Sequence, residues 1–136
     1  MSKQCLDVQQ MQHLQELGLD TSNASMYWIS YNEISVAVPR NFHLPASDNN
    51  YVICDAYTLQ DVLDALPKEI KPNTTRYFLR IDLSDECLYY YYDDRNLVEH
   101  RKKVIGYDGV DGLIDAAYEL LCWAIENKFI ETNKNE

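Results

Sequence analysis

Apolar positions recur at helical spacing in three parts of the chain. Apolar residues at every third position from Val8 to Leu17 predict a helix over about residues 6–17, with Gly18 as its C-cap. Thr58, followed three residues later by Asp61, predicts the start of a short helix that ends before Pro67. The strongest pattern is the last one, where a wide apolar arc predicts a long helix over about residues 109–129.

The pattern between residues 26 and 38 predicts a β-hairpin. A two-residue loop at Asn32 and Glu33 would bring Tyr31 opposite Ile34. Six apolar residues then share one side of the hairpin, and we call this set the hairpin face: Tyr27, Ile29, Tyr31, Ile34, Val36 and Val38. Because Glu33 is a poor residue for a tight primed turn, a longer loop remains an alternative.

A second hairpin is predicted over residues 76–92. Residues 76–83 alternate, and we expect Tyr77, Leu79, Ile81 and Leu83 on the inward side. The returning strand holds four consecutive tyrosines, so its register stays open: a three-residue loop places Arg80 opposite Tyr90, and a two-residue loop turns the other tyrosines inward. Short strands are also expected over residues 51–54 and, at a sheet edge, 97–105.

The order of these elements predicts an α+β fold. We expect an antiparallel β-sheet built from the two hairpins, with the long C-terminal helix and the shorter helices packed on one face. One domain is expected over residues 1–130, followed by a polar tail over residues 131–136.

Composition then narrows the class of protein. The chain has 136 residues, of which 46% are apolar, and this suits one globular core. With 22 acidic and 12 basic side chains its net charge is −10, which argues against a dedicated nucleic-acid binder. Residues 108–136 carry 7 acidic and 2 basic side chains, which is half of that excess. No apolar run reaches membrane-spanning length and residues 1–7 lack an apolar leader, so we expect a cytoplasmic protein without membrane contact.

Three segments resemble small uncharacterised proteins from phages and mobile elements of gut Bacteroidetes. They are residues 16–20 leading into the aromatic strand 26–29, residues 58–66, and residues 112–121. The resemblance implies a shared fold and a phage or mobile-element context, and it implies no catalytic residues.

Candidate chemistry from the residues is sparse. No Cys-x-x-Cys pair occurs among the four cysteines, so we expect no zinc site. We also expect no other metal or cofactor, and no motif indicates a catalytic residue set. The acids Asp108, Asp111, Asp115 and Glu119 are interpreted as a solvated helix stripe. A small-ligand or enzymatic site on an open sheet face is an alternative, and it would be lined by Arg76, Arg80, Tyr90 and Tyr92.

The apolar face of the last predicted helix is wider than one stripe. Tyr118, Cys122 and Trp123 extend it, so we predict that they form an interface. A single-layer sheet with one covered face would also leave aromatic surface to bury. The leading hypothesis is therefore a non-enzymatic accessory or interaction protein that associates with itself or another protein, most simply as a homodimer. An acidic inhibitor that mimics nucleic acid is a further alternative.

Overall fold

A computed structural model describes residues 4–71, 76–82, 87–92, 102–108 and 113–132. These residues form three helices and seven strands, and the predicted α+β class is confirmed. The elements follow in the order α1 (Val8–Glu16), β1 (Met26–Tyr31), β2 (Ile34–Pro39), β3 (Tyr51–Ala56), α2 (Leu59–Ala65), β4 (Glu69–Ile70), β5 (Tyr77–Asp82), β6 (Cys87–Tyr92), β7 (Lys102–Asp108) and α3 (Leu113–Glu126).

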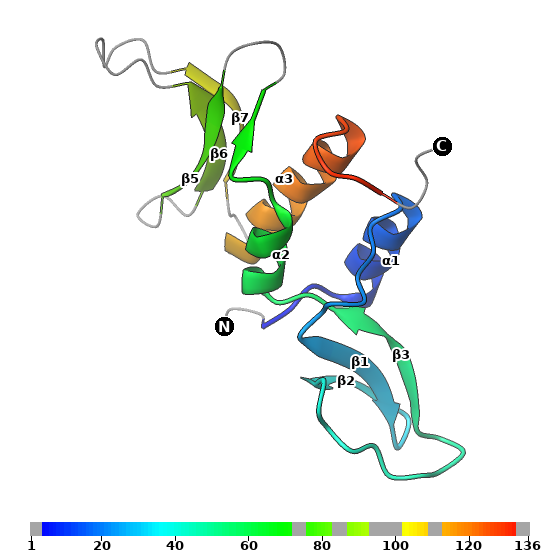
Figure 1. The fold of residues 1–136 in the computed structure, drawn as a ribbon. Coiled ribbons are helices and arrows are strands. Elements are labelled where there is room, and N and C mark those ends of the chain that lie inside the picture. Colours follow the sequence, from blue (N-terminus) through cyan, green and yellow to red (C-terminus); the bar gives the residue numbers. More distant parts are fainter. Residues whose placement is uncertain (1–3, 72–75, 83–86, 93–101, 109–112, 133–136) are drawn as a thin grey trace.

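The two hairpins belong to two separate antiparallel sheets. One sheet has the order β2-β1-β3 and the other the order β4-β5-β6-β7. Figure 1 shows the helices lying between the two sheets. The single sheet expected from the sequence is thus divided into two. In one sheet β1 pairs with β2 and β3, and in the other β5 pairs with β4 and β6.

Both short helices begin with a capping box. Asp7 accepts a hydrogen bond from the Gln10 backbone N at 2.8 Å and donates its own N–H to Gln10 Oε1 at 3.1 Å. Thr58 and Asp61 make the same reciprocal pair at the start of α2, as the sequence predicts. Gly18, with φ of 97°, follows the last turn of α1 in the conformation that favours glycine.

The predicted register of the first hairpin is confirmed. Tyr31 lies opposite Ile34, Ile29 opposite Val36, and the pairing runs on regularly to Pro39. The loop has two residues, Asn32 and Glu33, with φ of 50° and 70°. Positive φ at both positions matches the primed turn that suits the twist of a hairpin, so the longer loop is wrong despite the glutamate.

The second hairpin does not have the register of the three-residue loop. Arg80 lies opposite Tyr89 instead of Tyr90, and Asp82 pairs with Cys87, while residues 83–86 between the strands lie outside the described residues. Tyr77 and Leu79 pack against the core, as their alternation predicts. Ile81, expected on the same inward side, is 41% exposed, so the alternation does not hold along the whole strand. The predicted edge strand is present, but it spans residues 102–108 instead of 97–105.

The core lies in the helical layer. Its centre includes Leu120 and Leu121 of α3, Met11 and Leu14 of α1, and Val62 of α2, all fully buried. In addition, α3 contacts β6 and β7, so the helix that the sequence marks most strongly holds the four-stranded sheet to the rest of the molecule.

One end of the predicted long helix needs correction. Asp108, expected as the first acid of the helix stripe, is the last residue of β7. The described helix begins at Leu113, and Asp111 lies outside the described residues. The four acids therefore do not form one helical stripe. None of the described helices combines the length and apolar character needed to cross a bilayer.

Candidate interaction surface

The α3 residues that the sequence predicts as an interface pack largely inside the molecule. Cys122 is 7% exposed and belongs to the core, while Tyr118 and Trp123 are partly buried against it. The Tyr118 ring meets His13 of α1 edge-on at a centroid distance of 6.4 Å. The Trp123 ring lies 5.4 Å from that of Phe129. The wide apolar face of α3 is therefore matched by α1 and by the turn that follows α3.

Burial also sets the protonation states of Cys122 and Tyr118. It raises the pKa of Cys122 to about 11, although the hydrogen bond with the Tyr118 hydroxyl acts in the opposite direction. Burial and the same hydrogen bond raise the pKa of Tyr118 above its usual range. Both side chains are neutral near pH 7, so Cys122 is a packing residue and a poor nucleophile.

The alternative ligand site is described only in part. Arg76 Nε lies 2.6 Å from Glu69 Oε2, so this guanidinium has an acidic neighbour on β4. Arg80 is exposed on β5. In the observed register Tyr90 lies opposite Leu79, and Arg80 lies opposite Tyr89. The side chains of Tyr90 and Tyr92 lie outside the described part of the chain.

One acid of the predicted stripe, Asp115, links two helices. Asp115 accepts a hydrogen bond from Gln10 Nε2 at 3.0 Å, which ties the start of α3 to α1. Within the described residues, no cluster of three or more histidine, cysteine, aspartate or glutamate side chains is arranged to hold a metal ion.

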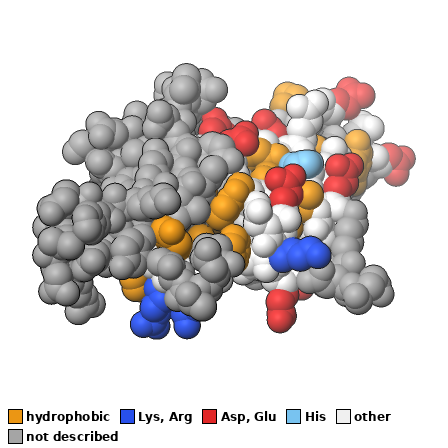
Figure 2. All heavy atoms as spheres, turned by 90° about the horizontal axis from the view of Figure 1, so that it is seen from above, with side chains coloured by type: hydrophobic (Ala, Val, Ile, Leu, Met, Phe, Trp, Pro, Cys, Tyr) orange, Lys and Arg blue, Asp and Glu red, His pale blue; other side chains and the backbone are white. Residues whose placement is uncertain are grey.

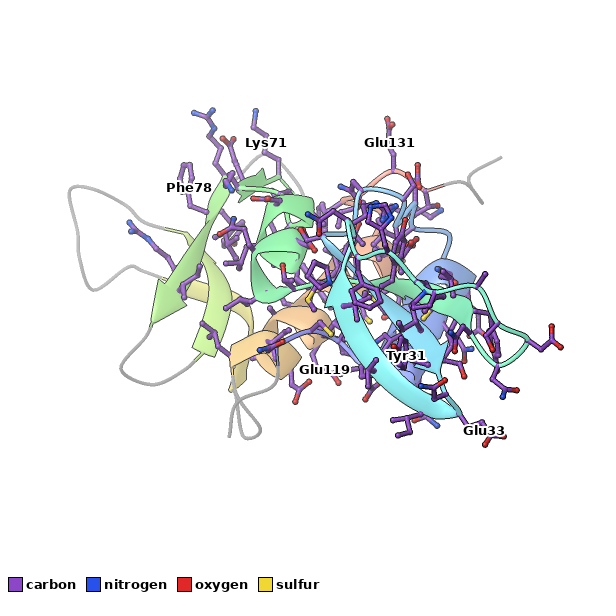
Figure 3. All side chains as sticks on the ribbon, turned by 90° about the horizontal axis from the view of Figure 1, so that it is seen from below. Tyr31, Glu33, Lys71, Phe78, Glu119 and Glu131 are labelled. Atoms are coloured by element: carbon purple, nitrogen blue, oxygen red, sulfur yellow. The ribbon has the colours of Figure 1, made fainter. Side chains whose placement is uncertain are left out.

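The hairpin face points away from the core. The opposite face of the sheet carries Trp28 and Cys54, which are direct partners across β1 and β3. Trp28 Nε1 donates to the Leu6 carbonyl at 2.8 Å, and Cys54 packs against the core. Since neighbours along a strand alternate between faces, Tyr27, Ile29 and Tyr31 lie on the outer side. In Figure 3, Tyr31 lies at the hairpin end of the molecule, far from Phe78 of β5.

Exposed apolar side chains concentrate on this sheet. Ile29 is 1% exposed, but its cross-strand neighbours on either side, Val36 and Val52, are 36% and 53% exposed. Ile34 is 63% exposed. We call the following set the β1–β3 surface: Ile34, Val36, Phe42 and Val52. Tyr51 is 58% exposed, but it lies opposite Ser30 and therefore on the other face of the sheet. Among the described residues, the other large exposed apolar side chains are Phe78 and Ile81 of β5.

The loop from β2 to β3 covers part of the outer face. Phe42 meets the Tyr31 ring edge-on at 6.4 Å. At the other end of the strand, Arg40 lies over the Tyr27 ring at 4.7 Å and 3.7 Å from Asp55 Oδ1. The charged groups thus lie at the rim of this face, and the exposed apolar side chains lie on its outer strands.

A different face of the molecule is less open to a partner. Figure 2 shows hydrophobic side chains gathered in the middle of the upper face, with acidic side chains beside them. The acids and the net charge of −10 oppose the approach of a second copy there.

The chain was compared with known proteins. No protein-family model matches it, and no curated protein or solved structure matches it either. Function must therefore be inferred from the surface itself.

The sequence pattern predicted which residues share the hairpin face, but not whether that face packs against the core or points to solvent. Trp28 and Cys54 on the opposite face are also apolar, so both faces of the sheet carry a hydrophobic signal. Only the contacts to residues far away in the chain, such as Leu6, decide which face meets the core.

Proposed function

We propose that this is a non-enzymatic interaction protein that associates with itself through the β1–β3 surface. The observation that carries this proposal is the row formed by Val36, Ile29 and Val52 across three strands, whose outer members are exposed. A sheet face with apolar side chains on neighbouring strands gains free energy when a partner removes them from water.

The charge distribution favours a second copy at this position. The strand β2 contains no charged residue, although the chain carries a net charge of −10. Two β2 strands can therefore approach without the repulsion that two acidic surfaces would meet. The interface predicted on α3 contributes less to this proposal, because Cys122 is buried and Tyr118 and Trp123 pack against the core.

Paired lysine variants test where the contact lies. Ile34→Lys places a charge on the β1–β3 surface, and Phe78→Lys places the same charge at an exposed apolar position of β5. In size-exclusion chromatography with light scattering, we expect wild type and the Phe78 variant to form dimers and the Ile34 variant to be monomeric. The opposite ranking of the two variants, or a monomeric wild type, would overturn the proposal.

The biological setting is part of the same proposal. We place the protein in the cytoplasm as an accessory protein of a phage or mobile element, and the support is the resemblance of three segments to proteins from such sources. Sequencing the genes that flank its own tests this setting, since phage or transfer genes are expected on both sides. Flanking genes of a host housekeeping operon would contradict it.

A further inference from the structure

The outer edge of β2 can accept another strand. In the order β2-β1-β3, β2 has β1 on one side and is the last strand on the other. A two-residue loop makes Tyr31 and Ile34 a hydrogen-bonded pair, and such pairs alternate along the ladder. The bond from Arg40 N to Ser25 O, at 3.1 Å, continues this alternation. Ser35 and Ala37 therefore direct their backbone N–H and C=O groups outward.

Most of this edge lacks the usual protection against pairing. Edge strands commonly carry charges, prolines or bulges that prevent another strand from adding. Residues 34–38 contain no charge and no proline, and their register with β1 is regular; Pro39 removes an outward N–H only at the last residue of β2. The other edge strand, β3, carries Asp55 and shifts register opposite Trp28 and Ile29. Of the two edges, β2 is thus the open one.

We infer that two copies of the chain join antiparallel through β2, so that the two sheets form one six-stranded sheet with Val36 on the twofold axis. This inference rests on the proposed self-association and specifies its geometry. Ser35 of each copy then lies opposite Ala37 of the other, and each of these pairs exchanges two hydrogen bonds. The backbone N–H and C=O groups of Ser35 and Ala37 on each β2 then all make hydrogen bonds to the second copy.

The side chains and charges select this register. On the hairpin face Val36 meets its own equivalent, and Ile34 lies opposite Val38 of the second copy. A shift by two positions would bring Ser35 opposite Pro39, which has no N–H to donate. In the proposed register Glu33 lies opposite Pro39, one position from Arg40 of the second copy. Glu33 projects from the hairpin tip (Figure 3). Glu33 thus lies near Arg40 of the second copy at both ends of the paired strands, although that guanidinium also donates to the Ala24 and Ser22 carbonyls and lies 3.7 Å from Asp55 of its own chain.

Cysteine variants on one strand test the geometry. At the twofold axis the two Val36 Cα atoms would lie about 4.5 Å apart, within the range that a disulfide bridges. Two Ile34 residues would lie four positions apart along the strands, or about 13 Å. Under mild oxidation with diamide, Val36→Cys is expected to form a disulfide-linked dimer. Ile34→Cys, which is more exposed, is expected to form none. Wild type controls for the native cysteines.

The outcomes separate this inference from the proposed self-association. If Ile34→Cys links as readily as Val36→Cys, or if Val36→Cys does not link while light scattering shows a wild-type dimer, the β2 pairing is wrong and the proposed function stands. If wild type is monomeric, both are wrong.

A proline variant gives a second, independent readout. Ser35→Pro removes one outward N–H from each copy and leaves the bonds to β1 in place, as edge strands tolerate. Since each copy loses one bond to the other, the dissociation constant of the dimer is expected to rise about tenfold or more. Ser35→Thr keeps the donor and should bind as wild type does. An unchanged constant for a Ser35→Pro variant with a wild-type circular dichroism spectrum would overturn the β2 pairing.

Discussion

Ser25 donates two hydrogen bonds to Asp61, from its backbone N to Oδ2 at 2.9 Å and from its Oγ to Oδ1 at 2.7 Å. Asp61 also accepts a bond from the Thr58 backbone N at 3.0 Å. One carboxylate thus joins the start of α2 to the residue that precedes β1, 36 positions earlier in the chain. This contact connects the helical layer to the sheet that carries the β1–β3 surface.

Asp61→Asn should lower the free energy of unfolding by about 1–2 kcal/mol, because the amide loses the charge and one of the two acceptors. Urea unfolding at pH 7 measures the change. Asp64→Asn on the same helix is the control, since Asp64 accepts a bond only from the exposed Gln60 among the bonds described. Its expected cost is about 0.5 kcal/mol or less. An equal loss of unfolding free energy in the two variants would show that the contacts of Asp61 do not stabilise the fold more than those of Asp64.

The same carboxylate gives a pH dependence with a defined sign. Burial acts to raise the pKa of Asp61, but the hydrogen bonds from Thr58 and Ser25 together outweigh it and lower the pKa. Because the pKa of Asp61 is lower in the folded protein than in the unfolded chain, where it is about 4, the ionised carboxylate stabilises the fold at pH values above about 4. This stabilisation is lost as the pH falls through the folded pKa. The difference in unfolding free energy between wild type and Asp61→Asn should therefore shrink below about pH 4. A difference that grows with acidification would contradict this sign.

Leu120→Ala tests the helical core. Leu120 is fully buried at the centre of the cluster, so the truncation should cost about 2–5 kcal/mol in the free energy of unfolding. Ile34→Ala, at an exposed site, should cost about 0.5 kcal/mol or less in the dilute monomer. Urea unfolding of both at low protein concentration gives the comparison, and similar costs would place the core elsewhere.

Cys122 should react slowly with thiol reagents in the folded protein. Its side chain is buried, and its pKa is raised to about 11, so little thiolate forms at pH 8. Iodoacetamide labelling followed by peptide mass spectrometry measures the rate at this residue in buffer and in urea. We expect labelling to accelerate strongly in urea. Equal rates in the two conditions would mean that Cys122 faces solvent.

Local signals in the sequence predicted the local structure well. The capping pair Thr58 and Asp61 fixed the start of α2, and the agreement of pattern with register fixed the first hairpin. The second hairpin had no such signal, because four consecutive tyrosines suit either face. The division into two sheets depends on β3 pairing with β1 across a long loop, and no local pattern encodes that choice.

The candidate surface was predictable only in part. The sequence grouped Ile34 and Val36 on one face, but it indicated α3 as the interface because Tyr118 and Trp123 widened its apolar arc. Contacts with His13 and Phe129 account for that width inside the molecule. Such contacts join parts of the chain whose proximity follows from the fold as a whole.

Sedimentation equilibrium of the wild-type chain over a range of concentrations tests the central claim, self-association, most directly. We expect the weight-average mass to rise from the 15.9 kDa of one chain toward twice that value as the concentration increases. A mass that stays at 15.9 kDa up to the highest concentration would contradict self-association, and with it the β2 pairing.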